Sequence, residues 1–133
     1  MRKIVVGYDG SEPARRALER AAELAGGGSV TVVAAVHVMP QFGRAPMQID
    51  PEEIDERRRE LHEAKAALEA KGIEAHAVEA HGDPADAIIE AAEKGADLVV
   101  VGTRGANLAS SVLLGSVSTK VVHEAPCDVM VVR

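Results

Sequence analysis

The chain has 133 residues, which suits one domain of ordinary size, and its hydrophobic share of 47% is enough for a packed core. Its 15 basic and 21 acidic residues give a net charge of −6, which repels the phosphate backbone of nucleic acids, and aromatic residues, on which bases could stack, make up only 2%. Nucleic acid is therefore not a suitable partner. The single cysteine, Cys127, excludes an internal disulfide and suits a cytoplasmic protein, and no apolar run approaches the roughly 20 residues that cross a membrane.

The first third of the sequence predicts a strand, a helix and a second strand. Ile4 to Val6 form a short apolar run that ends in a loop containing Asp9, and Ser11 can cap the helix that follows. The helix ends at Gly26 to Gly28, and its apolar face is expected to consist of Ala14, Ala17, Leu18, Ala21, Ala22 and Ala25. Val30 to Val38 is rich in β-branched residues and predicts an interior strand of a parallel sheet.

The middle of the chain predicts a flap, two helices and an edge strand. Met39 to Pro51 contains three prolines and is the longest irregular connection. Glu52 to Lys71 predicts a charged helix whose stretch from Glu52 to Lys65 is interpreted as a solvated face and not a binding patch. Ile73 to Ala80 alternates as an edge strand would, and Asp83 with Pro84 begins a helix whose buried face is predicted to be Ala85, Ile88, Ile89 and Ala92.

The last third predicts two strands with a helix between them. The apolar run from Leu98 to Val101 predicts a buried strand, and Cys127 to Val132 predicts the final strand. Between them, Val112 to Val122 predicts a helix whose inward residues are Leu114, Val117 and Val121. Strands and helices therefore alternate along the whole chain. This order predicts an α/β fold, with a single domain over residues 1–133 in which about four helices cover both faces of a doubly wound, five-stranded parallel sheet.

The loop after the fourth predicted strand carries the pattern of a phosphate cradle. Gly102, Gly105 and Gly115 are followed by Ser116 in the spacing G-x2-G-x9-G-S, whereas neither a G-x-G-x-x-G nor a Walker run is present. Glycine permits positive φ and leaves amides uncovered, so such a loop can wrap an anion at a helix N-terminus. Further donors are expected among neighbouring residues, namely Arg104, Asn107, Val117 through its main chain, Ser118 and Thr119.

Four segments make the chain resemble the universal stress protein family over essentially its full length. They are the start Ile4 to Ser11, the strand end Val36-His37-Val38, the glycine turn with Gly115-Ser116, and the tail Ala125 to Val132. The resemblance to the nucleotide-binding branch implies strand order 3-2-1-4-5 and binding of ATP. It implies that the glycine turn, Gly115 and Ser116 hold the phosphates, that Asp9 hydrogen-bonds the ribose or the adenine edge, and that the backbone of Val38 recognises adenine.

The resemblance also implies partners, and it leaves several functions open. A homodimer is expected through the exposed last strand, together with an unidentified regulatory protein partner. The leading interpretation is an ATP-binding regulatory protein of the stress response, with Mg²⁺ carried on the phosphates and with AMP, ADP or cyclic AMP as alternative ligands. A slow ATPase or autophosphorylating enzyme and a nucleotide-free dimeric scaffold are the alternatives.

Two expectations limit the chemistry of the site. No paired carboxylates or Ser/His/Asp order stands near the glycine loop, so no catalytic residue is predicted. The histidines lack metal-ligand spacing, so no protein-only metal site is predicted either. Asp9 retains a second interpretation, in which its carboxylate only caps the turn at Gly10 and Ser11.

Overall fold

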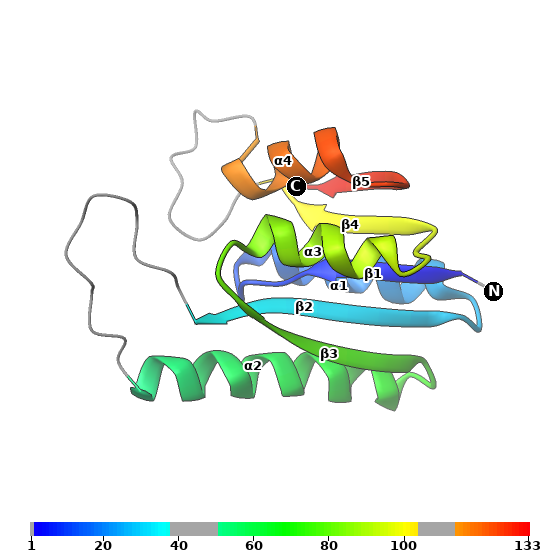
Figure 1. Ribbon diagram of the computed structural model, residues 1–133. Helices are drawn as coiled ribbons and strands as arrows, with labels where there is room; N and C mark the ends of the chain where they lie inside the picture. Colours follow the sequence, from blue (N-terminus) through cyan, green and yellow to red (C-terminus); the bar gives the residue numbers. More distant parts are fainter. Residues whose placement is uncertain (1, 38–50, 104–113) are drawn as a thin grey trace.

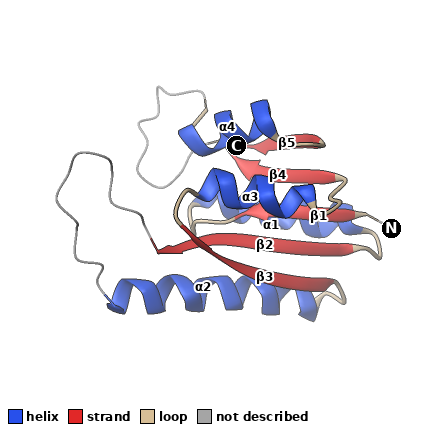
Figure 2. Cartoon of the chain, viewed as in Figure 1, coloured by secondary structure: helices blue, strands red, loops and turns tan. Residues whose placement is uncertain are grey.

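The computed structural model describes residues 2–37, 51–103 and 114–133, and within them strands and helices alternate along the chain (Figure 1). The elements are β1 (Lys3–Gly7), α1 (Glu12–Ala25), β2 (Ser29–His37), α2 (Pro51–Ala70), β3 (Glu74–His81), α3 (Pro84–Glu93), β4 (Leu98–Gly102), α4 (Ser116–Glu124) and β5 (Asp128–Val132). All strand pairs are parallel, and the arrows in Figure 2 point the same way. The order β3-β2-β1-β4-β5 confirms the predicted sheet.

The sheet separates two apolar layers, because alternate residues of each strand point to opposite faces. Ile4 and Val6 of β1 pack with α1 and α2, whereas Val5 packs with α3 and α4. In Figure 1, α3 lies in front of the sheet and α1 behind it. β1 is the middle strand and is almost fully buried, with Val6 0% exposed. Its continuous apolar run is therefore explained by burial on both faces.

The predicted caps define the helix ends. Ser11 Oγ accepts a hydrogen bond from the amide of Ala14 at 3.3 Å, and Gly26 ends α1 in the left-handed conformation. Asp83 Oδ1 accepts from the amide of Ala85 at 2.9 Å and caps α3. The buried face of α3 consists of the four residues predicted from its apolar spacing. Local chemistry and helical period thus account for these elements.

The fourth helix begins later than predicted. The sequence indicated Val112 to Val122, but α4 starts at Ser116, and Leu114 lies outside it. Gly115 is held in an extended conformation, with φ −76° and ψ 171°, and its amide donates to the carbonyl of Thr103 at 2.6 Å. This long-range bond sets the start of the helix, and the apolar period alone does not reveal it. Val121 is buried as predicted, and Val117 packs against the same core layer.

Two further expectations from the sequence concern the predicted flap and membrane-spanning helices. The predicted flap falls at 39–50, outside the described residues, except that Pro51 opens α2. None of the helices in the described parts of the chain has the length and apolar character needed to cross a bilayer.

Candidate nucleotide-binding site

A cavity of about 540 Å³ opens at the edge of the sheet where the strands end and the helices begin. The chain passes from β1 to β2 on one side, while β4 lies on the other side of β1, so the direction of the strand order reverses there. Open α/β sheets bind ligands at this reversal, because the loops on either side diverge and leave a crevice. The cavity lining includes Gly7 at the end of β1 and Tyr8 after it, Ala34 and Ala35 of β2, and Val101 near the end of β4.

The structure brings most of the predicted site residues together around this cavity. Asp9 lines it from the loop after β1 and Gly102 from the end of β4, and the remaining predicted residues that line it belong to the start of α4, namely Gly115, Ser116, Val117 and Ser118. Val38, Arg104, Gly105 and Asn107 lie outside the described residues. Six positions from three distant parts of the sequence therefore share one cavity.

The start of α4 presents main-chain amides to the cavity. Gly115 is the N-cap and supplies no side-chain acceptor, so the amides of Ser116, Val117 and Ser118 have no partner within the helix. Such amides point outward along the helix axis and carry part of the positive end of its dipole. This geometry favours an anion at the N-terminus of α4.

The neighbouring hydroxyl groups hold the helix start in place. Ser118 is buried. Its Oγ lies 3.0 Å from the carbonyl oxygen of Thr103 and 3.1 Å from that of Gly115, and both oxygens are acceptors for its hydroxyl hydrogen. Thr119 Oγ1 also donates to the Gly115 carbonyl, at 2.8 Å. Both hydroxyl groups therefore donate to main-chain carbonyls. They hold the first turn of α4, whose amides face the cavity, in its orientation.

Of the predicted glycines, neither Gly102 nor Gly115 has the positive φ that we expected, and Gly102 is explained by space. Gly115 has φ −76°, and Gly102 is not among the described glycines with positive φ. A Cβ at Gly102 would lie 2.8 Å from Pro13 Cβ and 3.0 Å from the Pro13 carbonyl carbon. The absence of a side chain therefore lets the end of β4 approach the first turn of α1.

Asp9 takes part in the turn that follows β1. Its Oδ1 accepts a hydrogen bond from the amide of Ser11 at 2.9 Å, which is the turn role that we considered from sequence. The side chain is nevertheless exposed and borders the cavity. The turn holds the carboxylate at the mouth of the cavity, and its hydrogen bond to a ribose or adenine stays a prediction.

Helix α2 supplies a charged wall that sequence analysis missed. We interpreted Glu52 to Lys65 as a solvated face, but Glu53, Glu56, Arg57 and Glu60 line the cavity. Arg57 Nη2 lies 3.4 Å from Glu53 Oε1, so the one cation of this wall is paired with one of its carboxylates. The four positions follow the i, i+3, i+4, i+7 spacing of one helix face, and Leu61, Ala64 and Leu68 continue that face into the core. This spacing was the signal in the sequence that the four charged residues share one face of the helix.

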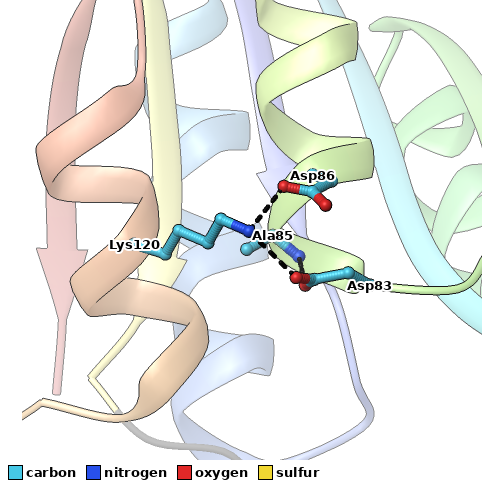
Figure 3. Close-up of polar contacts among 4 residues, drawn as sticks. All are labelled: Asp83, Ala85, Asp86 and Lys120. Carbon is cyan, nitrogen blue, oxygen red and sulfur yellow. Dashed lines mark hydrogen bonds and ion pairs between the residues drawn. The ribbon is translucent and has the colours of Figure 1, made fainter. Parts of the chain in front are cut away.

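A second feature missed from sequence is an ion-pair cluster between α3 and α4, shown in Figure 3. Lys120 Nζ lies 3.1 Å from Asp83 Oδ2 and 2.7 Å from Asp86 Oδ1. Partial burial alone would raise the pKa of Asp83, but the Lys120 ammonium and the Ala85 amide outweigh it and lower the pKa below its usual value. The same two carboxylates raise the pKa of Lys120.

The lowered pKa of Asp83 predicts a pH-dependent contribution to stability. A carboxyl whose pKa is lower in the folded state stabilises the fold above its unfolded pKa of about 3.9, and the contribution is lost as the pH falls through the lower folded value. We expect Asp83→Asn to cost about 0.5 kcal/mol at pH 7, a small amount because Asp83 is about half exposed and Asn also caps helices. Urea unfolding of both proteins between pH 7 and pH 2.5 measures this. A difference that stays constant over this range would contradict the assignment.

The described residues offer little alternative chemistry. No group of three His, Cys, Asp or Glu side chains in residues 2–37, 51–103 and 114–133 is arranged to hold a metal ion. Cys127 is partly buried, and burial together with Asp128 and Asp97 raises the pKa of its thiol. A protonated thiol is a poor nucleophile, which agrees with its interpretation as a small core residue.

The fold and the cavity define the class of the protein as an α/β protein with a cavity at the switch point of a parallel sheet. Comparisons with known proteins identify the family. The universal stress protein family model matches residues 1–133, and a universal stress protein of Thermus aquaticus is 42% identical over 138 residues, covering 98% of this chain and 97% of its own. The chain belongs to the universal stress protein family.

Two solved structures of the family are similar to the chain over nearly its whole length. The universal stress protein from Archaeoglobus fulgidus in complex with dAMP has a TM-score of 0.71 and 29% identity, covering 100% of this chain and 98% of that one. A universal stress protein in complex with cAMP has a TM-score of 0.74 and 28% identity, covering 99% and 97%. These relatives share the fold and were solved with adenine nucleotides.

Proposed function

We propose that this universal stress protein binds an adenine nucleotide in the cavity at the carboxyl edge of its sheet. In this proposal residues 1–133 form one cytoplasmic nucleotide-binding domain. ATP is the proposed ligand, and its binding regulates a protein partner in the stress response. The observation that carries the proposal is the meeting of Asp9, Gly102 and the start of α4 at one cavity.

The cavity has the size and the donors that the ligand requires. Its volume of about 540 Å³ falls within the roughly 300–1,000 Å³ of small-molecule sites. The amides of Ser116, Val117 and Ser118 suit a phosphate, and the ends of β1 and β4 supply apolar cover for a base. Complexes of two relatives with dAMP and cAMP support an adenine nucleotide as the ligand class.

The charges of the described lining residues favour one orientation of the nucleotide in the cavity. Asp9, Glu53, Glu56 and Glu60 are acidic, and Arg57 is paired with Glu53. Negatively charged phosphates are repelled by this wall and attracted to α4, so we place the phosphates at α4 and the ribose beside Asp9. A triphosphate brings more negative charge than a monophosphate, and Mg²⁺ on its phosphate oxygens would reduce the repulsion.

The proposal includes a homodimer formed through β5. Among the described strands, β5 pairs with β4 alone, and Val129, Met130, Val131 and Val132 are each partly exposed. An unpaired edge of this composition is prone to pair with another strand, and pairing with β5 of a second copy covers both edges symmetrically.

The test is to purify the protein, denature it and identify any released nucleotide by chromatography. The emptied protein is then titrated by calorimetry with ATP, AMP and cyclic AMP, with Mg²⁺ and with EDTA. We expect one nucleotide per chain and tighter ATP binding with Mg²⁺ than with EDTA, whereas the affinity for AMP should hardly depend on the metal. Light scattering on the same preparation should give twice the chain mass.

The outcome separates the alternatives. Steady release of ADP from bound ATP would favour the slow ATPase. A folded dimer that neither carries nor binds a nucleotide would refute the proposal and leave the scaffold interpretation.

A further inference from the structure

Two walls of the cavity come from segments that are distant in sequence. One wall is the start of α4, from Gly115 to Ser118, and the other is the start of α3, with Gly82 just before the helix and Pro84 as its first residue. The chain between them runs through α3 and β4 and through residues outside the described parts. The relative position of the two walls therefore depends on non-covalent contacts, namely the hydrogen bonds of Gly115 and Ser118 to Thr103 and the packing of α4 on α3.

The ion-pair cluster of Lys120, Asp83 and Asp86 joins these walls directly. The Lys120 ammonium reaches from α4 to two carboxylates at the start of α3, one of which also caps α3 through the amide of Ala85 (Figure 3). Asp83 lies between Gly82 and Pro84, which both line the cavity. Lys120 lies four residues after Ser116, on the same stripe of α4 and one turn further from the cavity.

The buried contacts of α4 lie on other sides of the helix, so the ion-pair cluster makes the contact on the side of Lys120. Within the described residues, the buried side chains of the helix are Ser118 and Val121, and α4 packs mainly on α3 and only lightly on β5. Ser118 and Val121 lie about 160° and 100° around the helix from Lys120. The hydrogen bonds of Gly115 and Ser118 to Thr103 fix the point where α4 begins, and the ion pairs oppose a rotation or tilt of the helix about that point and away from α3.

The position of α4 matters because the attraction of a helix N-terminus for an anion is confined to its first turn. Amide donors also require distances near 2.9 Å and good alignment. A displacement of about 1 Å would therefore weaken the hydrogen bonds to a phosphate and leave contacts with the base and the ribose unchanged.

We propose that Lys120 is a positioning residue for phosphate binding, which acts by tying the start of α4 to Asp83 and Asp86 at the start of α3. This inference rests on the proposed function. Both carboxylates hold the ammonium, so Lys120 acts through the placement of the α4 amides and not through contact with the ligand.

The test compares a ligand that has a phosphate with one that lacks it. Lys120→Met and Lys120→Arg are titrated by calorimetry with AMP and with adenosine, beside the unmodified protein. The control variant Arg20→Met removes an exposed cation on α1 that is paired with Glu23 and does not line the cavity. We expect Lys120→Met to weaken AMP binding by about tenfold and adenosine binding by less than about twofold. Lys120→Arg should retain most of the AMP affinity, and Arg20→Met should bind both ligands normally.

A second variant guards against loss of folding. Asp86→Asn removes one carboxylate of the cluster and leaves the Asp83 cap in place, so we expect a smaller loss of AMP affinity with adenosine binding unchanged. Unchanged AMP affinity in Lys120→Met, or equal losses for AMP and adenosine, would overturn the positioning role alone. Failure of the unmodified protein to bind AMP would refute the proposed function itself, and the positioning role with it.

Discussion

Replacing Gly115 by valine should lower nucleotide affinity on the order of 100-fold or more while the protein stays folded. Gly115 is buried, lines the cavity and caps α4 at the proposed phosphate site. Its φ of −76° and ψ of 171° are an extended conformation that valine adopts readily. The added isopropyl group therefore costs space beside the α4 amides more than it strains the backbone.

The control is Ala125→Val, which also ends in a valine side chain, with two carbons more than alanine, at the other end of α4. Ala125 is the C-cap of the helix, and its φ of −66° and ψ of 142° are also extended. Titration calorimetry with AMP and ATP gives the affinities, and circular dichroism with thermal unfolding verifies the fold. Retained affinity in Gly115→Val would show that the phosphates bind elsewhere.

Replacing Gly28 by alanine should destabilise the protein by about 3 kcal/mol or more. A Cβ at this position would lie 1.8 Å from the carbonyl oxygen of Arg2 and 2.7 Å from its carbonyl carbon and amide nitrogen. These are main-chain atoms that cannot rotate away. The adjacent amide of Ser29 donates to the same Arg2 oxygen at 2.9 Å, where the pairing of β1 with β2 begins, so relief of the clash would disturb the central strand pair.

The neighbouring glycine provides the control for this variant. A Cβ at Gly27 would meet nothing within 4 Å, and its φ of +87° is a conformation in which asparagine is tolerated better than other side chains. Gly27→Asn should cost about 1 kcal/mol or less. Urea unfolding of both variants decides the matter, and equal costs would show that the contact between Gly28 and Arg2 relaxes freely.

Elements whose ends are set by local chemistry could be predicted from the sequence. The face of α3 follows from apolar spacing and its start from Asp83, which the structure confirms. The start of α4 could not be predicted in this way, because a hydrogen bond between Gly115 and Thr103 determines it. That bond joins residues 12 positions apart in the sequence, and no periodicity reports it.

The same division applies to the candidate site. Gly102, Gly115 and Ser116 were found through their spacing, and Asp9 through its place after a buried strand and the family resemblance. The position of the acidic residues of α2 at the cavity was not predicted, because their spacing shows that Glu56 and Glu60 share a face but not that this end of the helix borders the cavity. Lys120 and Asp83 are 37 positions apart, so only the packing of α3 on α4 reveals their contact.

The central place of β1 also bears on how the chain folds while it is being synthesised. Ile4 pairs with Val30 on one side and with Leu98 on the other. One edge of β1 thus finds its partner early, whereas the other edge must wait until most of the chain has emerged from the ribosome. During that interval the middle strand of the finished sheet presents an open, apolar edge. The nascent chain is therefore most vulnerable to mispairing at β1, and the arrival of β4 ends that period.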